Sequence, residues 1–320
     1  MVLNLVVTCS DRKTRPVPRS RMLRSVRGHS IDDRITRWIK TLEDCSGESL
    51  PALELYAGDH WTVVKSLEGV AIARGLDPRV WIASAGYGLI PLRGAVRPYS
   101  ATFAVNHPDS VAAGAKRGDP RGLAQQWWAA LSLWRRGGTG MPRSLRALAA
   151  QEPNGALLVA ASSNYVRAAS ADLEAAANVL RSSDSLAVFS AATASLGALE
   201  RFLVPSSARL QALLGGARQS LNVRLLKRAL EEASQDTKLT APVLRAWAKE
   251  LATMQPPAPK YDHIPMSDDE VRHYITSKLQ QNAAGKHTAL LRQLRDSGRA
   301  CEQSRFRRLF EEVRGARHGS

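Results

Sequence analysis

The chain has 320 residues, 44% of them hydrophobic, which is typical of one large globular domain with a smaller one, or of two similar domains. No apolar run approaches the roughly 20 residues that a membrane-spanning helix needs. The N-terminus enters a strand-like segment without the layout of a signal peptide. We therefore expect a cytoplasmic protein with no membrane partner.

The charge is strongly positive and clustered. The chain carries 45 Lys and Arg against 29 Asp and Glu, a formal net charge of +16. Seven basic residues and one acid lie between Asp11 and Arg27, and nine basic residues and four acids follow from Lys286 onward. Solubility alone would account for a dispersed excess, whereas clusters favour a polyanionic partner, and we expect nucleic acid.

The first half of the chain alternates strand-like and helix-like segments. Apolar runs typical of buried strands begin at Leu3, Val80, Gly155 and Leu186, and segments with helical spacing lie between them. Such alternation predicts an α/β fold with a mostly parallel central sheet flanked by helices. A last helix of this half is expected to contain Gly197 and to end before Pro205.

Four regions are expected along the chain. Residues 1–205 form the α/β domain, residues 206–255 a helical extension, residues 256–265 a Pro-rich linker, and residues 266–320 a helical domain that is expected to bind DNA. The last domain opens with a capping box of Ser267 and Glu270. Its segment around Gly298 resembles a helix-turn-helix, with exposed arginines on the following helix, although a helical bundle with a solvated arginine face fits equally well.

Polar residues follow three of the predicted strands, which is where a parallel sheet binds ligands. The candidate ligand-contacting residues at these strand ends are Cys9, Ser10, Ser84, Gly86, Tyr87, Ser162, Asn164 and Tyr165. The amide of Asn164 carries both a donor and an acceptor, which suits the edge of a base, and a strand-end turn is its structural alternative. Cys9 is discounted as a nucleophile because the sequence identifies no partner for it.

Two acids and several aromatic residues complete the candidate site. Asp11 and Asp59 are candidate catalytic carboxylates, although capping would also account for both, and Asp59 is expected to be the N-cap of a helix. Tyr87, Tyr99 and Phe103 offer rings on which a base could stack, although each taken alone fits a core position. Trp127, Trp128 and Trp134 are expected to be packing residues.

No metal or cofactor is expected. His29, His107 and His287 lack metal-ligand spacing, and Cys9, Cys45 and Cys301 form no CxxC pair, so reduced thiols are expected. A P-loop and a GxGxxG fingerprint are both missing, so the sequence gives no support for nucleotide hydrolysis or dinucleotide chemistry.

Four ordered motifs carry a resemblance to a known family. TCSDRK (8–13), LYAGDHW (55–61), SAGYGLIP (84–91) and RPYSATF (97–103) resemble a bacterial family similar to the YaaA peroxide-stress proteins and to archaeosine synthase, with a fold related to uracil-DNA glycosylases. The C-terminal LLRQLRDSGRACEQSRFRRLF resembles the helical domain appended to such proteins. Within this group, the size and basic character most resemble anti-phage DNA glycosylases that remove bulky modified cytosines. The uracil-glycosylase signature GQDPYH is missing, so that family's catalytic Asp is not carried over to this chain.

The resemblance implies a DNA glycosylase that leaves abasic sites in double-stranded phage DNA, with glucosylated hydroxymethylcytosine as one such base. Cleavage of the C1′–N bond needs a carboxylate near C1′, a water and hydrogen bonds to the departing base. Backbone phosphates are expected to meet Arg12, Lys13, Arg15, Arg19, Arg305, Arg307 and Arg308. The alternatives are a non-catalytic DNA-binding stress or regulatory protein and an enzyme that modifies a tRNA base.

Overall fold

The computed structural model describes residues 2–44, 47–113, 119–134, 140–191, 196–234, 236–257, 263–282 and 284–318. The chain divides into two units, Met1–Pro257 and Ala258–Ser320. The middle of the expected linker, from residue 258 to residue 262, lies outside the described residues, as do Cys45 and residues 135–139. No helix in the described ranges is long and apolar enough to cross a membrane.

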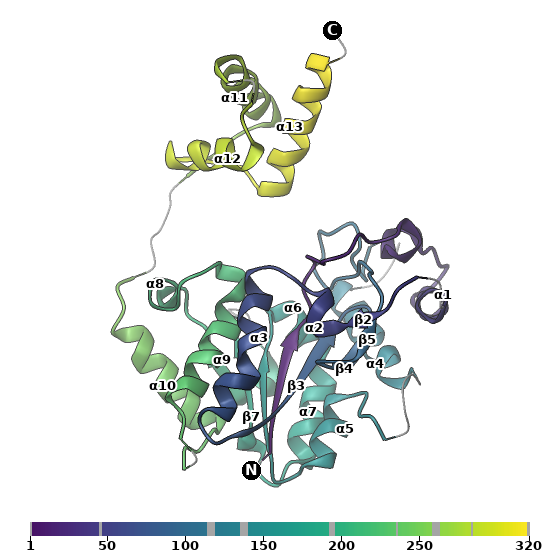
Figure 1. Cartoon of the computed structure of the whole chain (residues 1–320), viewed down its shortest axis with the longest axis vertical. Coiled ribbons are helices and arrows are strands. Elements are labelled where there is room, and N and C mark those ends of the chain that lie inside the picture. Colours follow the sequence, from purple (N-terminus) through teal and green to yellow (C-terminus); the bar gives the residue numbers. More distant parts are fainter. Residues whose placement is uncertain are drawn as a thin grey trace. The chain divides into compact units, whose positions relative to one another are not determined.

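The first unit is an α/β structure built on a six-stranded sheet in the part of the chain that is described (Figure 1). The strand order is β4-β3-β1-β6-β7-β8, and every neighbouring pair is parallel except β3 with β4. The strands are β1 (Val2–Thr8), β3 (Asp77–Ser84), β4 (Gly88–Pro91), β6 (Ala156–Ala160), β7 (Leu186–Ser190) and β8 (Leu203–Pro205). The expectation of a mostly parallel sheet is confirmed.

Helices cover both faces of this sheet. One layer contains α3 (Asp59–Ile72), α9 (Leu221–Glu232) and α10 (Ala241–Thr253), of which α9 and α10 contact β7. The other layer contains α4 (Pro120–Leu133), α5 (Leu145–Gln151) and α7 (Ser170–Val179). Shorter or peripheral elements are α1 (Ile31–Glu43), α2 (Ala52–Leu55), α6 (Ser163–Ala168), α8 (Gln211–Leu214) and the small ladder of β2 (Leu50–Pro51) with β5 (Ala95–Val96).

The helices after residue 205 are part of the first unit. Leu225, Leu226 and Leu244 are buried in the same hydrophobic core as the strands of the sheet. An amphipathic helix that lies on a sheet buries its apolar face there, so residues 206–255 complete one layer of the fold.

Two local expectations need correction. Residues 197–205 do not form one helix, because a 3-10 helix over Gly197–Phe202 gives way to strand β8. The N-cap of α3 is Gly58, whose φ of 99° suits glycine, and Asp59 is the first residue of the helix. Further 3-10 turns span Arg19–Arg21, Leu23–Ser25, Ser183–Ser185, Ala208–Leu210 and Arg218–Ser220.

The second unit contains three helices within its described residues, as the sequence predicts. They are α11 (Asp268–Gln281), α12 (His287–Asp296) and α13 (Gln303–His318), with a short parallel pairing of β9 (Ile264–Pro265) and β10 (Arg299–Ala300). The capping box of Ser267 and Glu270 is present, and Gly298 has a φ of 77° in the turn after α12. Val271, Leu294 and Phe306 are buried in a separate core.

Candidate functional site at the strand ends

The carboxyl ends of β1, β3 and β6 lie side by side because β1 pairs with both of the other strands. The next strand of the sheet after β1 is β3, which lies on one side of β1, and the later strands β6 and β7 lie on the other side of β1. Such a reversal beside a central strand is where open α/β sheets bind ligands. Two contacts join the three ends: Cys9 N–H donates to the Ala83 carbonyl at 3.0 Å, and Cys9 Sγ lies 3.1 Å from the Tyr165 hydroxyl.

A hydrogen-bonded group of side chains lies at these ends, and we call it the strand-tip cluster. The Tyr99 hydroxyl lies 2.6 Å from Ser84 Oγ and 2.8 Å from the Tyr56 hydroxyl. Ser84 Oγ also accepts the backbone N–H groups of Gly86 and Tyr87, which holds the AGYG turn in place. Burial raises the pKa of Tyr99 well above its ordinary value, so its hydroxyl stays protonated and can donate. The cluster consists of Cys9, Lys13, Tyr56, Ser84, Tyr99 and Tyr165.

The predicted stacking residues are packed against one another. Tyr99 is fully buried and Tyr87 and Phe103 are nearly so, with ring centroids 5.1 Å apart for Tyr87 and Tyr99. Phe103 meets Tyr165 edge-on at 4.9 Å. Ser84 and Tyr99, at 0% exposure, act on a ligand only through their neighbours, so a direct stacking role for Tyr99 does not fit this packing. Trp127, Trp128 and Trp134 are buried, as expected.

The surroundings of the Lys13 side chain differ from those of an exposed phosphate-binding residue, which the sequence predicts. Its Nζ donates to the Ser10 carbonyl at 2.7 Å and lies 4.8 Å from the centre of the Tyr99 ring. Burial lowers the pKa of Lys13, and the nearby Cys9, Asp11 and Asp109 offset this only in part. The ammonium group is thus held inside the strand-tip cluster. Arg12, Arg15 and Arg19 are exposed, and Arg15 lies 3.8 Å from Glu48.

The two candidate carboxylates have different surroundings. Asp11 is exposed directly after the β1 end and interacts electrostatically with Lys13 and Arg24. Asp59 accepts hydrogen bonds from Ser220, from the Ala217 N–H at 3.0 Å and from Arg224 at 2.7 Å. These bonds, with the Ser220 hydroxyl the strongest, lower the pKa of Asp59. Asp59 therefore ties α3 to α9, while Asp11 faces solvent beside the cluster.

Residues of the third strand end are less enclosed. Ser162 is exposed, Asn164 is half-buried in the first turn of α6, and Tyr165 contributes its hydroxyl to the cluster. Ser10 Oγ donates to the carbonyls of Arg12 and Ala57, which fixes the turn that carries Asp11. Asn164 thus lies on the β6 side of the site and Asp11 on the β1 side.

Tyr56 and Asp109 are site residues that sequence reasoning missed. Tyr56 follows α2 and is fully buried, and Lys13 forms an isolated antiparallel bridge with it. Asp109 is buried and accepts hydrogen bonds from Ser100 at 2.7 Å and from Arg24. The only signal for Tyr56 was its place in LYAGDHW, and Asp109 lies in a loop with no periodic pattern.

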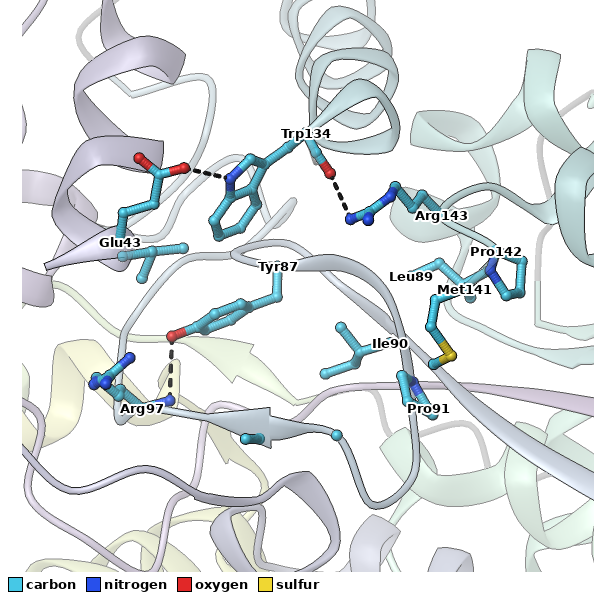
Figure 2. A pocket seen from close by; sticks show the side chains of 13 residues that line it. Glu43, Tyr87, Leu89, Ile90, Pro91, Arg97, Trp134, Met141, Pro142 and Arg143 are labelled. Carbon is cyan, nitrogen blue, oxygen red and sulfur yellow. Dashed lines mark hydrogen bonds between the residues drawn. The ribbon is translucent and has the colours of Figure 1, made fainter. Parts of the chain in front are cut away.

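A cavity of about 660 Å³ adjoins the AGYG turn at the β4 edge of the sheet (Figure 2). Tyr87 and Trp134 form an aromatic wall, with ring centroids 6.0 Å apart and planes at 28°. Its other walls are mostly apolar, and charged groups come from Glu43, Arg97 and Arg143. Glu43 accepts the Trp134 indole N–H at 2.8 Å, and Arg143 donates to the Trp134 carbonyl at 2.9 Å. Volume and lining are in the range of small-molecule sites.

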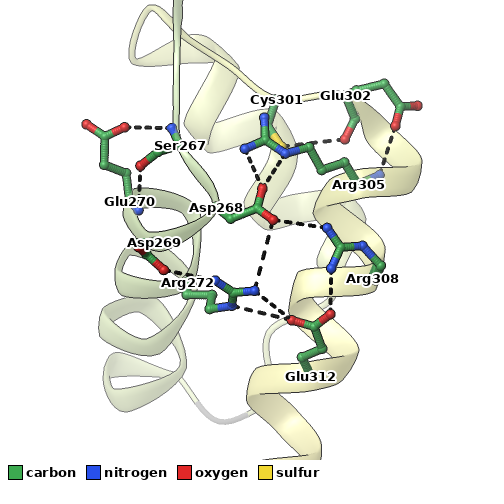
Figure 3. Close-up of polar contacts among 10 residues, drawn as sticks. All are labelled: Ser267, Asp268, Asp269, Glu270, Arg272, Cys301, Glu302, Arg305, Arg308 and Glu312. Carbon is green, nitrogen blue, oxygen red and sulfur yellow. Dashed lines mark hydrogen bonds and ion pairs between the residues drawn. The ribbon is translucent and has the colours of Figure 1, made fainter.

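The arginines predicted to bind DNA in the second unit are all ion-paired within that unit, and Figure 3 shows two of them, Arg305 and Arg308. Arg305 and Arg308 converge on Asp268 at 2.5 Å and 3.1 Å, and Arg308 also reaches Glu312. Arg307 pairs with Glu311 at 2.8 Å. The helical bundle with a solvated arginine face therefore accounts for these residues without DNA.

The fold and site define an α/β protein with a polar and aromatic cluster at the carboxyl ends of parallel strands. Comparisons of the chain with protein-family models, with curated proteins and with solved structures find no match.

Proposed function

We propose that this protein is a DNA glycosylase with a uracil-DNA-glycosylase-like fold that hydrolyses the N-glycosidic bond of a modified cytosine in double-stranded phage DNA. The observation that carries the proposal is that the carboxyl ends of β1, β3 and β6 lie side by side where the order of strands reverses, which places the AGYG turn and Tyr165 at the same end of the sheet as Cys9, two residues before Asp11. The sequence motifs that resemble the glycosylase-like family are the same segments that meet there.

The chemistry assigns Asp11 the role of the carboxylate. Departure of the base leaves positive charge on C1′ and O4′, which a nearby carboxylate stabilises while it orients a water. The exposed Asp11 can approach a sugar, whereas the Asp59 oxygens already accept bonds from Ala217, Ser220 and Arg224. Asn164, after the neighbouring strand β6, supplies donor and acceptor groups for the base.

The cavity beside Tyr87 supports a bulky base. In the sheet, β4 lies two strands from β1. Neighbouring strands are roughly 4.8 Å apart, so the cavity at β4 lies about 10 Å from the Asp11 turn. A plain pyrimidine bound at the β1 end does not extend that far. A large substituent on the base does reach the cavity, where the side chains of Glu43, Arg97 and Arg143 can hydrogen-bond to it.

Exposed arginines bind the phosphates of the DNA backbone. Arg12 and Arg19 lie in the segment that follows β1, so phosphates bound there hold the duplex next to Asp11. Their contacts offset part of the few kcal/mol needed to turn a base out of the helix.

The test is release of base from DNA. The purified protein is incubated with phage DNA containing glucosylated hydroxymethylcytosine and with the same sequence unmodified, and the products are examined by mass spectrometry and for alkali-labile sites. We expect free modified base and abasic sites from the first DNA only. We expect Asp11→Asn to abolish release of the base. Asp59→Asn also removes one negative charge, but at a structural position, and should still release the base.

The alternatives give different results. Salt-dependent DNA binding without release of base from any DNA contradicts the proposal and favours a non-catalytic DNA-binding protein. Competition by tRNA that exceeds competition by duplex DNA favours a tRNA-modifying enzyme.

A further inference from the structure

The Lys13 ammonium group occupies an unusual place for a lysine in a basic segment. Its neighbours in sequence, Arg12 and Arg15, are exposed, while Lys13 is mostly buried among aromatic side chains. Nζ lies 4.8 Å and 5.6 Å from the ring centres of Tyr99 and Tyr56. Of its three N–H groups, one donates to the Ser10 carbonyl, and the described residues provide no other hydrogen-bond acceptor for it.

This position is poorly suited to a backbone phosphate. Phosphates lie on the outside of a duplex, and a group that binds them has to stand out from the protein surface. The Lys13 ammonium instead lies over the rings that form the floor of the strand-tip cluster, two residues from Asp11. A planar heterocycle that has been turned out of the duplex is the part of the substrate that reaches such a place.

We infer that Lys13 is a catalytic residue that binds the departing base as a planar anion and does not bind backbone phosphate. The inference rests on the proposed glycosylase function and names the partner of Lys13 within that site. It also replaces the phosphate contact that the sequence suggested for this residue.

The C1′–N bond breaks and its electron pair stays on the base, whose developing negative charge accepts a hydrogen bond from the Lys13 Nζ–H. Water adds to C1′ and gives its proton to the Asp11 carboxylate, and Lys13 gives a proton to the base nitrogen. Proton return from Asp11 to Lys13 through solvent restores both groups, so one water is consumed and the neutral base is released. Burial, which lowers the pKa of Lys13, makes this proton easier to give.

The test compares Lys13→Met with Arg12→Ala in two measurements on the full chain. The first is the dependence of the DNA dissociation constant on salt concentration, in which loss of one phosphate contact lowers the slope by about 1. We expect that fall for Arg12→Ala and an unchanged slope for Lys13→Met. The second is single-turnover base release, which we expect Lys13→Met to slow by roughly 100-fold or more, as for loss of a group that stabilises developing negative charge.

Further readouts separate chemistry from folding. Lys13→Arg keeps the charge and the contact with the tyrosine rings and is expected to recover part of the rate. The wild-type rate of release should fall at alkaline pH as Lys13 loses its proton, and Lys13→Met should lack that fall. Thermal melting of each variant shows whether the fold is kept.

The outcomes are distinguishable. If the wild type releases base but Lys13→Met loses about one unit of salt slope, or releases base at the wild-type rate, the inference is wrong and the proposed function stands. If the wild type releases no base from any DNA, the proposed function fails and the inference fails with it.

Discussion

The Arg24 guanidinium donates two hydrogen bonds to the carboxylate of Asp109, at 2.9 Å from Nε and 2.5 Å from Nη2, and the Arg24 backbone N–H donates a third at 2.8 Å. The Asp109 side chain is fully buried, whereas Arg24 is half-exposed. The pair joins the basic segment after β1 to the loop that carries Tyr99 and Phe103. The arginine-rich segment is thereby fixed beside the strand-tip cluster.

Replacement of Arg24 is expected to destabilise the protein. Burial alone would raise the pKa of Asp109, but hydrogen bonds from Arg24 and Ser100 outweigh it and hold that pKa below its usual value. Arg24→Met removes both guanidinium hydrogen bonds from this buried carboxylate, which is expected to lower the free energy of unfolding by about 3 kcal/mol. The measurement is the free energy of unfolding in urea at pH 7, with Arg27→Met as control, because Arg27 is exposed and near the same loop. Arg24→Met combined with Asp109→Asn should recover part of the loss, and equal stability of Arg24→Met and Arg27→Met contradicts the prediction.

His60 predicts a specific pH dependence of stability. Its Nε2 lies 3.0 Å from the Thr8 carbonyl, and burial lowers its pKa from 6.5 to about 4. The unfolded chain therefore binds a proton between pH 6.5 and 4 that the folded chain does not, so stability falls as the pH falls through this range. The free energy of unfolding is expected to fall by about 3 kcal/mol over this range, because each pKa unit of difference between the folded and unfolded chain corresponds to roughly 1.4 kcal/mol.

Unfolding free energies measured from pH 7 to pH 4 test this expectation. His60→Gln removes the titrating group and should flatten the decline, although the variant is less stable at pH 7. His29→Gln is the matched control because His29 is exposed, and its decline should equal that of the wild type. A wild-type profile that is level across this range would refute the assignment.

The sequence predicts the parallel part of the sheet well because those strands are buried on both faces. The apolar runs at Leu5–Val7, Val80–Ile82 and Leu157–Val159 can be read directly, and each is buried. Strand β4 is different: Gly88–Pro91 turns back against β3 immediately after the AGYG turn, and four residues show no period. Strand β8 has three residues and lies against β7 and α10, so contacts distant in sequence define it and no local pattern does.

The candidate site could be predicted at the level of segments but not of side-chain contacts. Strand ends that are adjacent in a parallel sheet must lie together, so Cys9, Ser84 and Tyr165 were identifiable. Whether a basic or aromatic side chain faces solvent depends on residues far away in sequence. The Lys13 ammonium lies over the rings of Tyr56 and Tyr99, and the Asp59 carboxylate is already ion-paired because Arg224 comes from α9, 165 residues further along the chain.

Gly86 in the AGYG turn leaves room for Tyr99. A Cβ built at Gly86 would lie 2.3 Å from the Tyr99 ring, closer than atoms can approach. Gly86→Ala therefore forces Tyr99 to move, which breaks its bonds to Ser84 and Tyr56 and costs about 2 kcal/mol, as overpacking does. Gly69 lies in the last turn of α3, and an added Cβ there would have nothing within 4 Å, so Gly69→Ala should raise stability by up to about 1 kcal/mol. Thermal melting distinguishes them, and a Gly86→Ala protein as stable as the wild type contradicts the close packing.

Asp268 is expected to restrain the arginines of the second unit. Hydrogen bonds from Arg305 and Arg308 lower the pKa of Asp268, and Arg272 approaches to 4.0 Å. A phosphate presented to these guanidinium groups has to compete with that carboxylate. If the second unit contacts DNA through α13, Asp268→Asn should steepen the salt dependence of DNA binding more than Asp296→Asn does. Asp296 is an exposed acid on α12 with no ion pair to these arginines, so both variants add the same charge and only one releases guanidinium groups. Equal slopes for the two variants would mean that Arg305 and Arg308 serve only to hold α11 against α13, and that the grip on DNA belongs to the arginines after β1.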